Sequence, residues 1–90
     1  MAFEWDKIKA ANNLEKHGVS FAEAQTVFDD PLFVDFYDPD HSFDEHRFII
    51  IGLSASGRLL FVSYTERGAN LCLISARETT STERRDYEEG

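Results

Sequence analysis

Residues 47–76 read RFIIIGLSASGRLLFVSYTERGANLCLISA and contain three apolar runs separated by two short polar turns. The runs are rich in β-branched and aromatic residues, which favour strands, and each turn contains a glycine, as tight hairpins often do. The first run, RFIIIGLS, is apolar on both alternating sides, so we expect a central strand with both faces covered. The stretch predicts an antiparallel meander that forms most of a sheet.

A first helix is predicted over residues 7–17. The opening AFEW is typical of a short strand, and Asp6 after it is a suitable helix N-cap. Gly18 stands where a left-handed residue closes a helix. The helix carries one narrow apolar stripe, formed by Ile8, Ala11 and Leu14.

A second helix is predicted to begin after Ser20, because Ser20 and Glu23 have the spacing of a capping box, and to extend to about Phe28. The residues expected to be buried on it are Phe21, Ala24, Val27 and Phe28. The triplet DDP ends it, LFVDFY predicts a strand, and DPDHSFDE is a polar loop. After the meander, Thr80 and Glu83 form a second capping box before a short polar helix.

The order of these elements predicts one domain over residues 1–90 with an α+β fold. In this fold an antiparallel sheet is covered by two N-terminal helices and a short C-terminal helix.

The charge of the chain is unevenly distributed. The formal net charge is −8: residues 1–45 hold eleven acidic residues against three lysines, and residues 46–90 hold six against six arginines. Such a chain is not expected to bind nucleic acid by bulk electrostatics, so an RNA contact requires a local cluster of cations. The acidic first half suits a basic protein partner.

The composition also predicts the cellular setting. Cys72 is the one cysteine, which excludes an intrachain disulfide and fits a reducing cytosol. The first residues lack the pattern of a secretory signal, and the longest apolar run, FIII at 48–51, is too short to span a bilayer. We therefore expect a cytoplasmic protein.

The last hairpin carries two arginines at strand ends, Arg67 and Arg77. If residues 68–69 form the turn, Leu60 lies opposite Arg77, and Tyr64 shares the face of Arg77. Side-chain alternation then predicts that the two arginines project from opposite faces of the hairpin. Either one of them binds a phosphate, or both are solvated, as is common at strand ends.

Three further features have alternative interpretations. Lys16 and His17 end the first helix, where cations interact favourably with the helix dipole, or they act as an electrophile and a general acid–base pair. The loop DPDHSFDEH has carboxylates and histidines without the spacing of an EF-hand or a zinc helix, so we expect a solvated loop. Cys72 lies mid-strand and is expected to be a packing thiol.

The motifs taken in order resemble the BrnT family of type II toxin–antitoxin systems. They are FEWDKIKAANNLEKHGVSFAEAQTVFDD at 3–30, DPDH at 38–41 with the acidic–basic pair Glu45 and Arg47 after it, IGLSASGRLLFVSYTERG at 51–68 and ISARETTSTERRDYEE at 74–89. The resemblance implies a RelE-like fold and a metal-independent ribonuclease that inhibits translation. It also implies a BrnA-like antitoxin with a ribbon-helix-helix domain, through which alone the complex would contact DNA. The substrate implied is RNA, and the assembly implied is a homodimer or a toxin–antitoxin heterotetramer. The resemblance implies no cofactor and no contact with a membrane.

The cleavage implied by the resemblance needs a base for the ribose 2′-hydroxyl, cations at the phosphate and an acid for the leaving 5′-oxygen. The candidates are Arg67 and Arg77 for charge stabilisation, with Lys16 and His17 for proton transfer or phosphate positioning. Of the two arginines we expect at most one to contact the phosphate, and we favour Arg77, at the end of the last strand. Further candidates are Tyr64 and Glu45.

Two positions depart from the family. A basic residue is usual where this chain has Cys72, and Lys is frequent where it has Glu78. Both changes remove positive charge near the expected phosphate site and would cost ~2–6 kcal/mol of transition-state stabilisation. The alternative function is therefore a BrnT-like module that pairs with an antitoxin and contributes to operon regulation but cleaves RNA weakly or not at all. An acidic metal-binding domain is a distant third.

Overall fold

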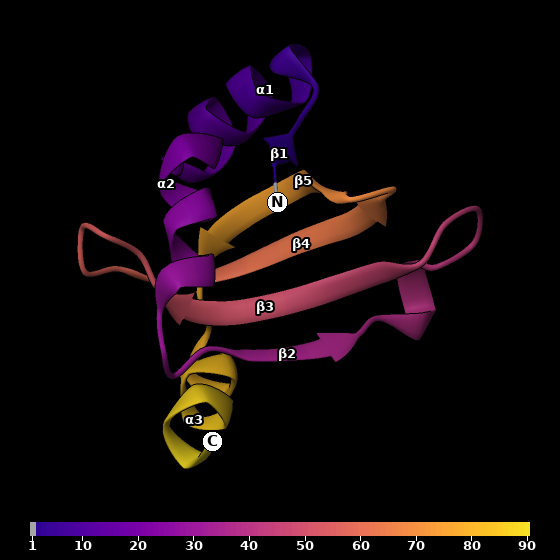
Figure 1. The fold of residues 1–90 in the computed structure, drawn as a ribbon. Helices are drawn as coiled ribbons and strands as arrows, with labels where there is room; N and C mark the ends of the chain where they lie inside the picture. Colours follow the sequence, from indigo (N-terminus) through magenta and orange to yellow (C-terminus); the bar gives the residue numbers. More distant parts are fainter. Residues whose placement is uncertain (1) are drawn as a thin grey trace.

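The computed structural model describes residues 2–90, which form a five-stranded sheet with three α-helices and two 3-10 turns (Figure 1). In chain order the elements are β1 (Phe3–Glu4), α1 (Lys7–His17), α2 (Phe21–Gln25), η1 (Thr26–Asp29), β2 (Val34–Tyr37), η2 (Pro39–His41), β3 (Arg47–Leu53), β4 (Leu59–Arg67), β5 (Asn70–Glu78) and α3 (Ser81–Glu89).

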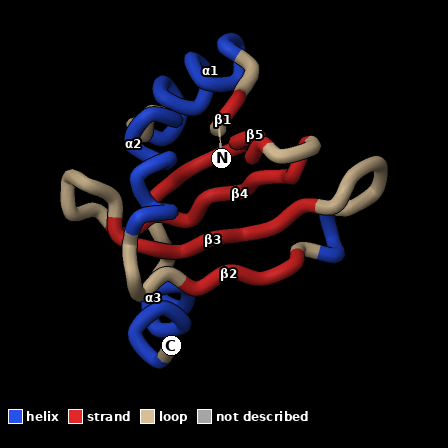
Figure 2. Tube along the Cα trace, viewed as in Figure 1, coloured by secondary structure: helices blue, strands red, loops and turns tan. Residues whose placement is uncertain are grey.

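The sheet has the order β1-β5-β4-β3-β2 and forms one continuous layer (Figure 2). All neighbours are antiparallel except β1, which runs parallel to β5. The α+β class and the meander are therefore confirmed. The central strand is β4 rather than β3, although β3 is internal, as its apolar run predicts.

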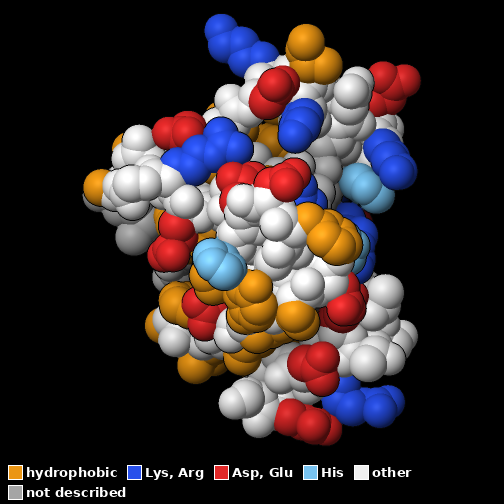
Figure 3. Space-filling model, turned by 90° about the vertical axis from the view of Figure 1, so that its right-hand side faces the viewer, with side chains coloured by type: hydrophobic (Ala, Val, Ile, Leu, Met, Phe, Trp, Pro, Cys, Tyr) orange, Lys and Arg blue, Asp and Glu red, His pale blue; other side chains and the backbone are white. Residues whose placement is uncertain are grey.

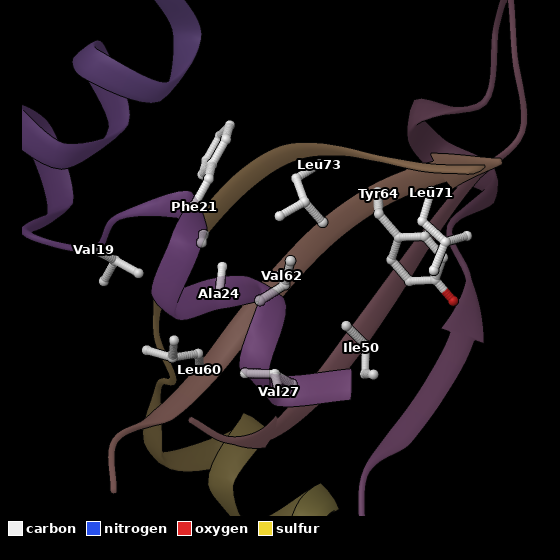
Figure 4. Packing of buried hydrophobic residues seen from close by; sticks show 11 residues of the cluster. Val19, Phe21, Ala24, Val27, Ile50, Leu60, Val62, Tyr64, Leu71 and Leu73 are labelled. Carbon is white, nitrogen blue, oxygen red and sulfur yellow. The ribbon is translucent and has the colours of Figure 1, made fainter. Parts of the chain in front are cut away.

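Helices cover both faces of the sheet. On one face, buried side chains of α2 and η1, such as Phe21 and Val27, pack against Ile50 and Val62 of the sheet (Figure 4). On the other face, Tyr87 of α3 packs against a smaller cluster formed by Ile49, Ile51 and Leu59. Successive side chains along β3 and β4 point to opposite faces of the sheet, which is why neighbouring residues belong to different clusters.

Helix α1 has its predicted bounds and caps. The Asp6 carboxylate accepts hydrogen bonds from the backbone N–H groups of Ile8 and Lys9, and Gly18 has a left-handed φ of 69°. However, the apolar stripe does not pack on the core. Ile8 and Leu14 are 73% and 52% exposed, and Ala11 is exposed too.

A polar side chain fixes α1 to the sheet instead. Asn13 is 7% exposed; its amide donates to the carbonyls of Val19 and Ala76, at 2.9 and 2.8 Å, and accepts from the Ala76 N–H. Strand β1 pairs only with Leu71 and Cys72 of β5. Asn13 therefore completes the hydrogen bonding of β5 farther along the same edge, because a side-chain amide has the donor and acceptor of a peptide group.

The second helix is shorter than predicted, because the α-helix ends at Gln25 and continues as η1. Only half of the predicted capping box forms. The Ser20 hydroxyl accepts from the Glu23 N–H, but the Glu23 carboxylate turns to the β3–β4 turn, where it accepts from Ser54 at 2.7 Å and from Arg58 Nε at 3.0 Å. Helix α3, in contrast, has the complete capping box predicted for Thr80 and Glu83.

Candidate functional site

A β-bulge changes the predicted placement of the two hairpin arginines. The register shifts between Ser63 and Tyr64, so Arg77 lies opposite Phe61 rather than Leu60. Since Phe61 and Arg67 share one face of β4, both arginines lie on the same face of the sheet, and the prediction of opposite faces was wrong. Six residues of β4 separate the two positions, about 20 Å, so they cannot hold one phosphate together.

Arg77 links β5 to α3. Its guanidinium lies over the Phe61 ring, 4.2 Å from the centroid, and donates to both carboxylate oxygens of Glu83 at 2.8 and 2.9 Å. A bidentate pair of this kind fixes the position of the side chain. A role of Arg77 at the phosphate stays a prediction.

Tyr64 lies in the core between the rings of Phe28 and Phe48. Its hydroxyl donates to Asp35 at 3.4 Å. Burial, together with the charge of Asp35, raises the pKa of Tyr64 to about 12, so the phenol keeps its proton at neutral pH.

A cleft of about 330 Å³, called here the Arg67 cleft, lies between the start of α1, β5 and the loop before β3. Its charged lining residues are Glu4, Asp6, Lys9, Glu45, Arg47 and Arg67. The Arg67 guanidinium donates to Glu45 at 3.4 Å and lies 4.0 Å from Glu4. The three cations of this cleft are thus balanced by three carboxylates, and Glu45 contacts Arg67 directly.

Cys72 also lines the Arg67 cleft. Its side chain is 7% exposed, and burial raises the pKa of the thiol. The thiol is therefore uncharged at neutral pH and contributes packing where a basic residue was expected from the resemblance.

A second cleft, of about 220 Å³, adjoins the first along α1 and β5 and is called here the His17 cleft. Its lining residues are Lys9, Asn12, Asn13, Lys16, His17, Ile74 and Ser75. Lys9 and Ile74 line both clefts, so the two lie next to each other. Among the described residues no carboxylate lines the His17 cleft, and its charge is therefore positive.

Lys9 is the residue that the sequence analysis missed. Lys9, Asn12, Asn13 and Lys16 have the spacing i, i+3, i+4, i+7, which places them on one face of α1. This polar stripe, and not the apolar one, faces β5. The regular spacing was a readable signal, but an apolar stripe is the usual mark of the packed face.

On the side of the molecule shown in Figure 3, Lys and Arg side chains are interspersed with Asp and Glu and form no broad basic field. Phosphate binding would therefore depend on a local group of cations, such as that of the His17 cleft. Within residues 2–90 no three His, Cys, Asp or Glu side chains are grouped as metal ligands. Each α-helix in the same range is too short or too polar to cross a membrane.

Comparison with known proteins identifies the family. The family described as "Ribonuclease toxin, BrnT, of type II toxin-antitoxin system" matches residues 5–83. No curated protein sequence matches the chain. Among solved structures, the ribonuclease toxin BrnT of Brucella abortus matches with a TM-score of 0.66 and 24% identity, over 90% of this chain and 99% of that chain. At this identity the match supports the fold, and the family assignment rests on the sequence: the chain belongs to the BrnT family of toxins from type II toxin–antitoxin systems.

Proposed function

We propose that this protein is a metal-independent ribonuclease of the RelE-like kind, which inhibits translation and is neutralised by a BrnA-like ribbon-helix-helix antitoxin. The family description supports the ribonuclease activity. One observation carries the choice of site: Lys9, Lys16 and His17 line a single cleft that has no carboxylate in its described lining.

The His17 cleft supplies the groups that metal-free RNA cleavage requires. The ammonium groups of Lys9 and Lys16 neutralise charge that develops on the phosphate oxygens. The imidazole of His17 moves the proton, because imidazoles can accept and donate protons near neutral pH. The ribose 2′-oxygen attacks phosphorus and loses its proton, the bond to the 5′-oxygen breaks, and that oxygen is protonated. The products are a 2′,3′-cyclic phosphate and a 5′-hydroxyl.

Arg67 binds the neighbouring part of the RNA backbone in this proposal. Its ion pairs with Glu45 and Glu4 are at the surface, with the Arg67 side chain 54% exposed. Surface pairs of this kind contribute little, about 0–1 kcal/mol. A phosphate can therefore replace the carboxylates as the partner of Arg67.

The second candidate function is that of a BrnT-like protein-binding module that cleaves RNA weakly or not at all. The charges of the Arg67 cleft are balanced, and Cys72 lines it where the resemblance leads us to expect a basic residue. A domain in which these features abolish cleavage would still pair with an antitoxin and contribute to operon regulation.

Induced expression in bacteria, with and without the antitoxin, tests the proposal. We expect growth arrest and RNA decay that the antitoxin prevents. Lys16→Gln is expected to relieve the arrest, and Lys7→Gln is the matched control, because Lys7 is an exposed lysine of α1 outside both clefts. Absence of arrest by folded protein would refute the ribonuclease and leave the second candidate.

A further inference from the structure

Exposed apolar side chains are concentrated along one edge of the sheet. Of the eight large apolar side chains that are exposed within residues 2–90, five lie on β2, just before it or at the adjoining end of β3. They are Leu32, Phe33, Phe36, Tyr37 and Leu53, and together with β2 they are called here the β2 edge. Leu32 is 70% exposed and Phe36 47%, so this surface is far more apolar than the charge of the chain suggests.

The backbone of β2 is available for pairing. Strand β2 is the last strand of the sheet, and its residues 35–37 are exposed. The Asp38 N–H donates to the Arg47 carbonyl at 2.8 Å, in register with the β2–β3 pairs. Because hydrogen-bonded pairs alternate in an antiparallel ladder, Val34 and Phe36 bond to β3, while the N–H and C=O groups of Asp35 and Tyr37 point away from it.

The charge around β2 selects the partner. Residues 29–45 contain seven acidic residues and neither Lys nor Arg. A second copy paired through β2 would bring the acidic residues of two such segments close together, which opposes self-association. An extended segment with apolar side chains and flanking Lys or Arg fits both the exposed rings and the charge.

We propose that the β2 edge is a docking surface for an extended segment of the antitoxin, which adds a sixth strand to the sheet beside β2. The added strand pairs with Asp35 and Tyr37, its apolar side chains cover Phe36, and its basic residues meet nearby carboxylates. This inference rests on the proposed pairing with an antitoxin.

Strand β2 is separated from the His17 cleft, because β4 and β3 lie between β5 and β2. An antitoxin strand on β2 therefore anchors the complex without itself filling the His17 cleft. Substitutions at the β2 edge are expected to weaken antitoxin binding while the free toxin keeps its activity.

Amide exchange measured by NMR tests the docking surface. The probe is the antitoxin encoded beside this chain's gene, co-expressed with the isotope-labelled chain. We expect exchange of the Asp35 and Tyr37 amides to slow at least tenfold in the complex, whereas Val34 and Phe36, already bonded to β3, are protected in both states. A complex in which Asp35 and Tyr37 exchange as fast as in the free chain would overturn the inference and leave the proposed function intact. Failure to form any complex would remove the antitoxin pairing as well.

A pair of matched variants locates the partner independently. Phe36→Lys is expected to weaken antitoxin binding about tenfold or more, since it replaces an apolar anchor by a charge that repels a basic segment. Ile8→Lys makes the same change at an exposed apolar residue of α1 and is expected to leave binding unchanged. The reverse result would place the partner on α1. A dimer of the chain alone that Phe36→Lys converts to a monomer would assign the edge to self-pairing. Either outcome contradicts the proposal.

Discussion

Asn13 shows how much of this fold depends on single polar side chains. It is one of two adjacent asparagines in a helix whose large apolar residues, Ile8 and Leu14, are exposed, yet it forms three hydrogen bonds to backbone groups of two other segments. Asparagine is a weak helix former, so its place in the middle of α1 reflects these bonds rather than local preference.

The substitution Asn13→Ala tests that role. It leaves the Ala76 N–H and the Val19 and Ala76 carbonyls without their partner, and each unpaired buried group costs about 1–3 kcal/mol. Allowing for relaxation and entry of water, we expect the free energy of unfolding to fall by about 2–4 kcal/mol in urea denaturation. Asn12→Ala, at the exposed neighbour, is expected to change it by less than about 0.5 kcal/mol. Equal losses in the two variants would contradict the account.

Glu23 predicts a specific acid sensitivity. The hydrogen bond from Arg58, with further bonds from Ser56 and Ser54, lowers the pKa of Glu23 from 4.5 to about 2. Because the folded-state pKa lies below the unfolded one, the carboxylate stabilises the fold fully above pH 4.5, and this contribution is lost as the pH falls toward 2.

The variant Glu23→Gln checks this pH dependence. At pH 7 we expect it to be less stable than the parent by about 1–3 kcal/mol, the cost of a charged hydrogen bond. The difference should shrink between pH 4.5 and 2, the window set by the two pKa values. Glu15→Gln, at an exposed position of α1, serves as the control. A difference that stays constant with pH would show that the charge of Glu23 is not the cause.

At the scale of elements, local signals predicted most of the fold. The caps at Asp6, Gly18 and Thr80 mark helix ends in the structure, because capping depends on neighbouring residues alone. The bulge in the last hairpin could not be predicted from the sequence. The alternation of side chains assigns faces only once the pairing of the two strands is known, and an extra residue in one strand changes that pairing. The orientation of α1 was also hidden, because it depends on the Ala76 backbone 63 residues away.

Helix α3 allows two roles of Arg77 to be separated. The helix is held to the sheet by Arg77 through Glu83 and to the loop after η1 by Tyr87, whose hydroxyl donates to Asp30 at 2.7 Å. Arg77→Ala and Glu83→Gln both break the first link, and we expect faster amide exchange in α3 for both. If Arg77 also contacts phosphate, only Arg77→Ala relieves toxicity. Equal relief by the two variants would mean that Arg77 acts through α3.

At the scale of the whole molecule, the site was predictable only in part. Lys16 and His17 adjoin the Arg67 cleft through Lys9, whereas Arg77 lies elsewhere on the sheet and Tyr64 in the core. The resemblance indicated which residues to consider for the site. Which of them lie close together in space depends on how α1 packs against β5, and that could not be read from the sequence. The acidic composition is resolved spatially as well, since none of the seven acidic residues at 29–45 lines the His17 cleft, whereas Glu45 lines the Arg67 cleft.

The central claim is that the His17 cleft cleaves RNA without a metal, and cleavage of a labelled RNA by purified toxin in EDTA tests it most directly. The toxin is freed from its antitoxin by denaturation and refolding, and Lys7→Gln is assayed beside His17→Gln and Lys16→Gln. We expect the parent and Lys7→Gln to cleave the RNA at equal rates in EDTA. Each cleft variant is expected to cleave it about 10²-fold more slowly or worse, because removing an acid–base or charge-stabilising group has an effect of this size. Cleavage that EDTA abolishes, or cleft variants as active as the parent, would contradict the account.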